Sequence, residues 1–111
     1  MEPLKLIEPQ PGQFSLLLND YATSAIDATV TELGHTPNGY FWEGVAQTIV
    51  RQQAPELKAR FRFDCEAGMF CAYGTDRAAL DQLGRLLSVL ATSPDALRAL
   101  MSSANPDDFD D

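Results

Sequence analysis

The residues from Arg60 to Thr75, RFRFDCEAGMFCAYGT, constrain the fold more than any other stretch of the sequence. Apolar and polar side chains alternate in its first half, which places Phe61, Phe63 and Cys65 on one side of an extended chain. The residues Glu66 to Gly68 interrupt this alternation, and a glycine at the last loop position suits a backbone with positive φ. The stretch therefore predicts a β-hairpin with a three-residue loop.

The register that follows from such a loop places six apolar side chains on one face of the hairpin. It pairs Cys65 with Met69, Phe63 with Cys71, and Phe61 with Tyr73. Helices elsewhere in the chain are expected to cover this face, because an apolar sheet face needs a second layer. Both cysteines are then buried structural thiols. We expect them to be reduced, because the sequence has no export signal and the cytosol is reducing.

The rest of the chain supplies two more strands and four helices. Alternating residues predict strands at 3–8 and 13–18, joined by a turn of prolines and a glycine. Helical spacing predicts a helix stopped by Gly34, a second from Tyr40 to Gln53, a third capped by Thr75 or Asp76, and a short helix from Ser93. The order is ββααββα with this short helix added. We therefore predict an α+β fold, an antiparallel sheet of about four strands with helices packed on one face.

Length and charge limit what the chain can do. Its 111 residues suit one domain, 1–104, followed by an acidic tail, 105–111. The net charge is −8, made of −5 in residues 1–43, +1 in residues 44–104 and −4 in the tail. Such a balance argues against nucleic acid and favours a basic partner or solubility. No apolar run reaches the roughly 20 residues of a membrane span, so we expect no membrane contact and a cytoplasmic location.

The residues that carry out catalysis in proteins are sparse in this chain. Its one histidine, His35, lies in a predicted loop, where we expect it to be exposed. No nucleophile motif, phosphate loop, dinucleotide fingerprint or metal-ligand spacing is present, and the spacing of the cysteines differs from that of zinc sites. We therefore predict no enzyme activity, no cofactor and no metal. A small hydrolase using Glu43, His35 or a cysteine is the catalytic alternative.

Candidate contact residues lie at the start of the second helix, at the hairpin tip and in the tail. Trp42 is better explained as a core residue than as an interface anchor. Gly44 in the same helix costs about 1 kcal/mol against alanine, so we expect a close approach there, to the sheet or a neighbouring helix. The acids of the tail lie outside the core stripes, so we expect them to have few structural roles and to steer a basic partner. The candidates are Tyr40, Trp42, Glu43, Glu66, Asp107, Asp108, Asp110 and Asp111.

Two segments, GYFWEG at 39–44 and FDCEAGMFCAY at 63–73, resemble the immunity protein 51 family. With the helix that follows Asp76, the resemblance covers roughly residues 38–90. It implies a bacterial cytosolic protein, encoded beside a polymorphic toxin, that binds the toxin and blocks it without enzyme activity. It transfers no contact residues, so the candidates above rest on physical inference. A regulatory or structural module with another protein partner fits the composition equally well.

Overall fold

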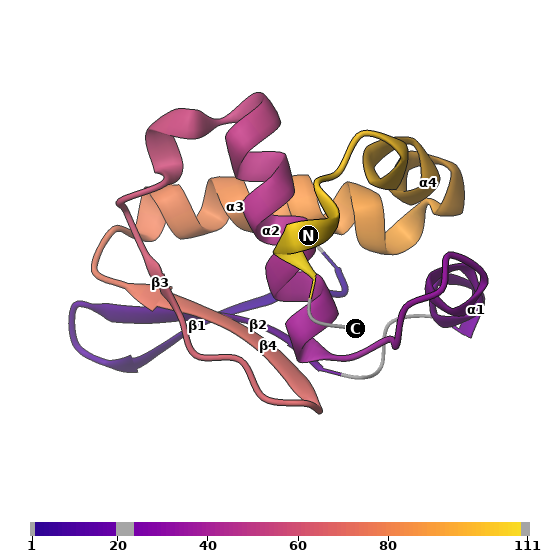
Figure 1. Ribbon diagram of the computed structural model, residues 1–111. Helices are drawn as coiled ribbons and strands as arrows, with labels where there is room; N and C mark the ends of the chain where they lie inside the picture. Colours follow the sequence, from indigo (N-terminus) through magenta and orange to yellow (C-terminus); the bar gives the residue numbers. More distant parts are fainter. Residues whose placement is uncertain (1, 20–23, 110–111) are drawn as a thin grey trace.

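The computed structural model describes residues 2–19 and 24–109 and confirms the α+β fold. In these parts of the chain one antiparallel sheet has the strand order β1-β2-β4-β3. Helices α2 and α3 lie over one face of the sheet, and α1 and α4 pack beside each other at its end (Figure 1). The strands are β1 (Lys5–Gln10), β2 (Gln13–Asn19), β3 (Arg62–Phe63) and β4 (Met69–Gly74). The helices are α1 (Ser24–Glu32), α2 (Gly39–Gln53), α3 (Arg77–Thr92) and α4 (Pro94–Ser102), with short 3-10 helices η1 (Pro55–Leu57) and η2 (Pro106–Asp108).

Local sequence signals begin and end the helices. The side chains of Asn38, Asp76 and Ser93 each accept a hydrogen bond from the backbone N–H three residues later, which caps α2, α3 and α4. At the end of α1, Gly34 has a φ of +88°. The next N–H, that of His35, donates to the carbonyl of Val30 at 3.1 Å, so the chain leaves the helix in a Schellman motif. The predicted stop at Gly34 is confirmed.

The hairpin of β3 and β4 forms, but its predicted register is wrong by one residue. Arg62 pairs with Tyr73 and Phe63 with Ala72, and an isolated bridge joins Glu66 to Met69. The N–H of Glu66 donates to the carbonyl of Met69 at 2.9 Å, and the reverse bond measures 3.1 Å. These two bonds close a loop of two residues instead of three. Gly68 is not among the described glycines with positive φ.

A shift of one residue turns β4 over, because successive side chains on a strand point to opposite faces. Phe70 and Ala72 are fully buried under the helices, opposite Leu18 and Leu16 of β2. The predicted face is therefore correct for β3, where the ring of Phe63 lies 6.0 Å from that of Phe70, and wrong for β4. Three residues of β4 alternate with Phe70 and Ala72 and therefore face away from the helices, whereas the prediction placed them on the buried face. They are Met69, Cys71 and Tyr73.

Both glycines of the 39–44 segment allow a close approach of the backbone. A Cβ atom on Gly39 would lie 2.0 Å from the carbonyl oxygen of Glu66, and its N–H donates to the carbonyl of Ala67 at 3.1 Å. A Cβ atom on Gly44 would lie 2.7 Å from the ring of Phe109. The close approach expected at Gly44 is confirmed, and it is made to the C-terminal segment, at the end of the 3-10 helix η2 and at Phe109.

The C-terminal segment is packed against α2 through Phe109. This ring is buried, with its centroid 5.5 Å from that of Phe41 and 5.1 Å from that of His35. His35, expected to be exposed, is half-buried because its ring packs against those of Phe41 and Phe109. Residues 105–109, which the sequence assigns to a separate acidic tail, thus contribute an aromatic side chain to the core.

Substitution of Gly44 by alanine tests this packing through the sign of its effect. In an unhindered helix the change stabilises by about 1 kcal/mol. Here we expect the free energy of unfolding, measured in urea, to fall by about 1–3 kcal/mol, because the added methyl group meets the Phe109 ring and the Asp108 backbone. In a Phe109→Ala background the same substitution should cost less. An increase in stability in the single variant would contradict the close approach.

Candidate functional site

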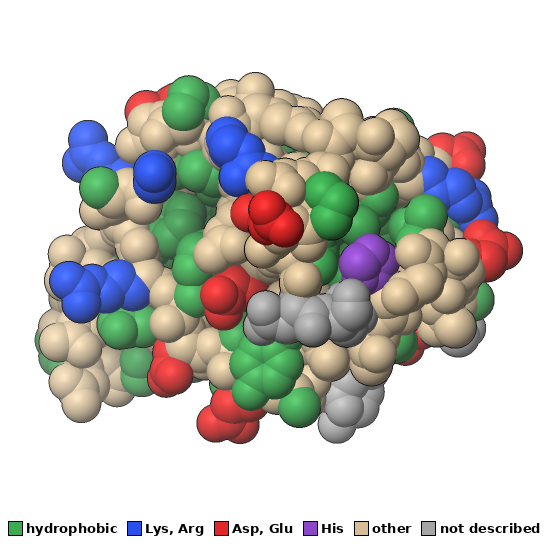
Figure 2. All heavy atoms as spheres, in the orientation of Figure 1, with side chains coloured by type: hydrophobic (Ala, Val, Ile, Leu, Met, Phe, Trp, Pro, Cys, Tyr) green, Lys and Arg blue, Asp and Glu red, His purple; other side chains and the backbone are tan. Residues whose placement is uncertain are grey.

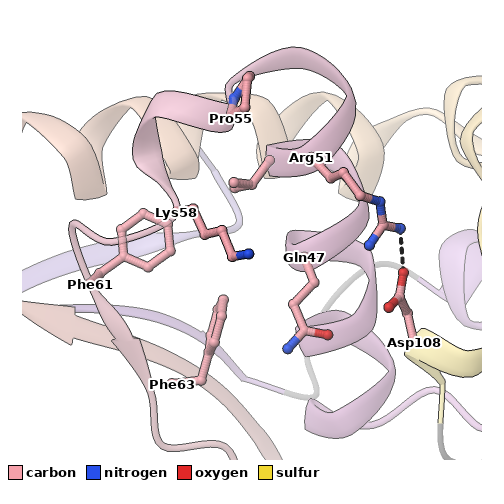
Figure 3. A pocket seen from close by; sticks show the side chains of 8 residues that line it. Gln47, Arg51, Pro55, Lys58, Phe61, Phe63 and Asp108 are labelled. Atoms are coloured by element: carbon pink, nitrogen blue, oxygen red, sulfur yellow. Dashed lines mark hydrogen bonds and ion pairs between the residues drawn. The ribbon is translucent and has the colours of Figure 1, made fainter.

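A groove of about 480 Å³ lies between α2 and β3, at the edge of the sheet (Figure 3). Alternation along the chain into β3 turns Phe61 and Phe63 toward the helices, and their rings meet edge to face at 5.7 Å. Gln47 and Arg51 are one helical turn apart, so α2 presents both to the groove. The groove therefore has an apolar wall and a polar one. Its lining residues are Gln47, Val50, Arg51, Pro55, Lys58, Phe61, Phe63 and Asp108.

Basic side chains gather around this groove. Four of the eight basic residues of the chain fall between residues 51 and 62, and Figure 2 shows basic side chains near η1 and β3. Arg51 is paired with Asp108, and Arg60 with Asp76 at 3.5 Å. Within residues 2–19 and 24–109, no ion pair involves Lys58 or Arg62. A chain with a net charge of −8 thus carries a local basic surface.

Asp108 fixes one side of the groove. Its carboxylate binds the Arg51 guanidinium and accepts a hydrogen bond from Oγ1 of the buried Thr48 at 3.4 Å. The hydrogen bond and the negative charge of Asp108 raise the pKa of Arg51. The expectation that the tail acids have few structural roles is therefore wrong for Asp108, because η2 folds back onto α2. Asp107 is exposed, and Asp110 and Asp111 lie outside the described residues.

A second set of candidate residues meets at the other end of α2. The bond from Gly39 to Ala67 holds the first turn of this helix against the hairpin tip. Tyr40 is 45% exposed, and Glu66 is exposed at the tip. Glu43 is half-buried, and its carboxylate contributes to the raised pKa of the Cys65 thiol. The structure therefore brings Glu43 and the Glu66 loop to the same end of the molecule.

Trp42, the remaining candidate from the second helix, belongs to the core. It is 4% exposed, and its ring meets that of Phe41 edge to face with centroids 5.5 Å apart. This burial agrees with the structural interpretation of the residue. Its burial anchors the first turns of α2 to the core.

The two cysteines are free thiols in different surroundings. The Sγ atom of Cys65 accepts a hydrogen bond from the backbone N–H of Cys71 at 3.4 Å. In a regular antiparallel ladder the acceptor at this position is a backbone carbonyl oxygen. Burial raises the pKa of Cys65 to about 12, and the carboxylate of Glu43 adds to the rise. Burial and the charges of Asp64 and Glu66 also raise the pKa of Cys71. Both thiols are protonated at neutral pH, so neither is an activated nucleophile.

Catalytic and metal-binding arrangements find little support in the described residues. No group of three or more histidine, cysteine, aspartate or glutamate side chains is placed there to hold a metal ion. The ring of His35 packs against those of Phe41 and Phe109, which also contact each other. None of the described helices is both long enough and apolar enough to cross a membrane.

The sequence profile of immunity protein 51 matches residues 4–106, nearly the whole chain. The chain belongs to the immunity protein 51 family. The match extends the resemblance through the N-terminal strands and up to the start of η2. The two segments that carry the resemblance, 39–44 and 63–73, are in contact in the fold, because Gly39 packs on the hairpin loop. No curated protein and no solved structure matches the chain.

The raised pKa of Cys65 predicts a loss of stability in alkaline solution. In the unfolded chain this thiol titrates near pH 9.0, whereas in the folded protein its pKa is about 12. Below the unfolded value both states hold the proton. Above it the unfolded state loses the proton first, so the free energy of unfolding falls as the pH rises toward the folded pKa.

Urea unfolding at pH 8 and pH 10.5 measures this effect against a matched variant. Cys65→Ser keeps an acceptor for the N–H of Cys71 but does not titrate in this range. The wild-type protein should lose more stability between the two pH values than the serine variant does. Equal losses would show that the Cys65 thiol is not held in its protonated form by the fold.

Proposed function

We propose that this protein binds a cognate bacterial toxin and neutralises it in the cytoplasm of the cell that produces it. The observation that carries the proposal is the family match over residues 4–106. An inhibitor of this kind needs a specific surface and no chemistry of its own. The protonated thiols of Cys65 and Cys71 are consistent with a protein that acts by binding.

The proposed contact surface includes the end of the molecule where the start of α2 meets the hairpin tip. Tyr40 offers an exposed aromatic ring, and tyrosine is enriched at protein interfaces. Glu43 and Glu66 place carboxylates at the same end. The buried Trp42 anchors the start of α2 to the core and is not part of the proposed contact surface. A basic region of the toxin is the partner that suits these charges.

The net charge of −8 supports electrostatic steering of such a toxin. We propose that the acids of the C-terminal segment, Asp107, Asp110 and Asp111, contribute to this long-range field. Asp108 is already paired with Arg51, so we assign it the role of holding η2 against α2. Steering of this kind acts on the association rate and weakens as salt screens the charges.

Co-expression tests the proposal directly. The toxin encoded beside this protein should arrest growth when expressed alone, and this protein should restore growth and co-purify with the toxin. A regulatory or structural module for another partner would give neither rescue nor co-purification. Growth arrest that persists when both proteins are expressed would refute the proposal.

Stopped-flow kinetics with the purified toxin separates contact from steering. The double variant Glu43→Gln/Glu66→Gln should dissociate roughly tenfold faster, because it removes carboxylates from the contact surface. Asp107→Asn should instead slow association at low salt and leave dissociation nearly unchanged. Asp95→Asn, at a side chain that is 99% exposed on α4, is the control and should change neither rate. Wild-type kinetics in the double variant would remove Glu43 and Glu66 from the interface.

A further inference from the structure

The sheet ends at β3 in an edge that is open to pairing. Arg62 pairs with Tyr73, and the N–H of Asp64 donates to the carbonyl of Cys71 at 3.0 Å. Residues 62 and 64 therefore direct their backbone groups toward β4. Backbone groups alternate in direction along an antiparallel strand, so the N–H and C=O of Phe63 point away from the sheet.

The groove described above lies beyond this edge, on the helix side of the sheet. Phe61 and Phe63 form its apolar wall, and α2 and η1 overhang it with Gln47, Val50 and Pro55 (Figure 3). A strand placed beside β3, at the usual spacing of about 4.8 Å, sends alternate side chains under this overhang. The groove is thus placed where the inward side chains of a fifth strand would lie.

The charges of the groove define what such a strand should carry. In Figure 3 the Lys58 side chain extends into the groove between Phe61 and Gln47, whereas Arg51 turns toward Asp108. Among the described residues no carboxylate pairs with Lys58. The binding of Asp108 by Arg51 shows that a carboxylate can be held at this rim. A cation beside an apolar wall is suited to a segment with an apolar side chain and a neighbouring carboxylate.

We propose that the free edge of β3 and the groove bind an extended segment of the toxin, which adds as a fifth strand to the sheet. The segment places an apolar side chain against Phe61 and Phe63 and a carboxylate at Lys58. Backbone hydrogen bonds to Phe63 supply affinity, and the groove supplies specificity. This inference rests on the proposed function, because the segment belongs to the toxin.

The competing explanation for the same features is protection of the edge. A short edge strand with basic residues in and beside it resists pairing with other chains. β3 has only two residues, the first of which is Arg62, and Lys58 and Arg60 precede it. Protection alone does not require an apolar hollow beneath α2. It also predicts that the edge stays unpaired when the toxin binds.

Amide exchange in the complex with the toxin encoded beside this protein distinguishes the two explanations. In the free protein, NMR should show slow exchange at Arg62 and Asp64, which bond to β4, and fast exchange at Phe63. In the complex the Phe63 amide should exchange at least about tenfold more slowly, because it then donates to the added strand. An unchanged Phe63 amide in a complex that still neutralises the toxin would overturn the strand addition and leave the proposed function standing.

A charge-reversal pair tests the groove itself. Lys58→Glu should weaken toxin binding by about tenfold or more, because it places a carboxylate where the partner's carboxylate is expected. Lys5→Glu is the matched control, since Lys5 is exposed on β1 at the opposite edge of the sheet, and it should bind as the wild type does. Equal binding by both variants would overturn the role of Lys58. Absence of toxin binding by the wild-type protein would overturn this inference together with the proposed function.

Discussion

The fold depends on how closely α2 approaches two other segments. At its start, Gly39 lies against the hairpin loop with no room for a side chain, and Gly44 makes the same contact with Phe109. These contacts set the position of the helix over β4 and join parts of the chain that are distant in sequence. The groove exists because α2 is fixed in this place while the sheet ends at the two residues of β3 beneath it.

The segment 105–109 is held by two different kinds of interaction. Phe109 removes an aromatic ring from water against Phe41, and Asp108 pairs with Arg51 beside the buried Thr48. Because Arg51 is already paired with Asp108, this basic side chain of the groove is not available to a partner. The C-terminal segment therefore shapes the proposed binding surface as well as the core.

Charge has opposite signs at the two ends of α2. Acidic residues surround its first turn, and basic residues surround its last turn and η1 (Figure 2). The averages along the sequence hide this separation, because residues 44–104 contain nearly equal numbers of acids and bases. A partner that meets both ends is recognised by two complementary patches, which favours one orientation of binding.

The sequence alone determined the strands and α-helices, their order and the family, because caps, turns and hydrophobic periodicity act over a few residues. Asp76 and Ser93 are recognisable as caps without knowledge of their neighbours in space. Only the tertiary structure decided the register of the hairpin, the burial of Phe109 and the grouping of Lys58 with Phe63. The register depended on one residue of loop length, which two backbone bonds between Glu66 and Met69 fix once the strands meet. The groove depended on contacts between segments far apart in the chain, and local sequence patterns do not indicate which of these segments will be in contact.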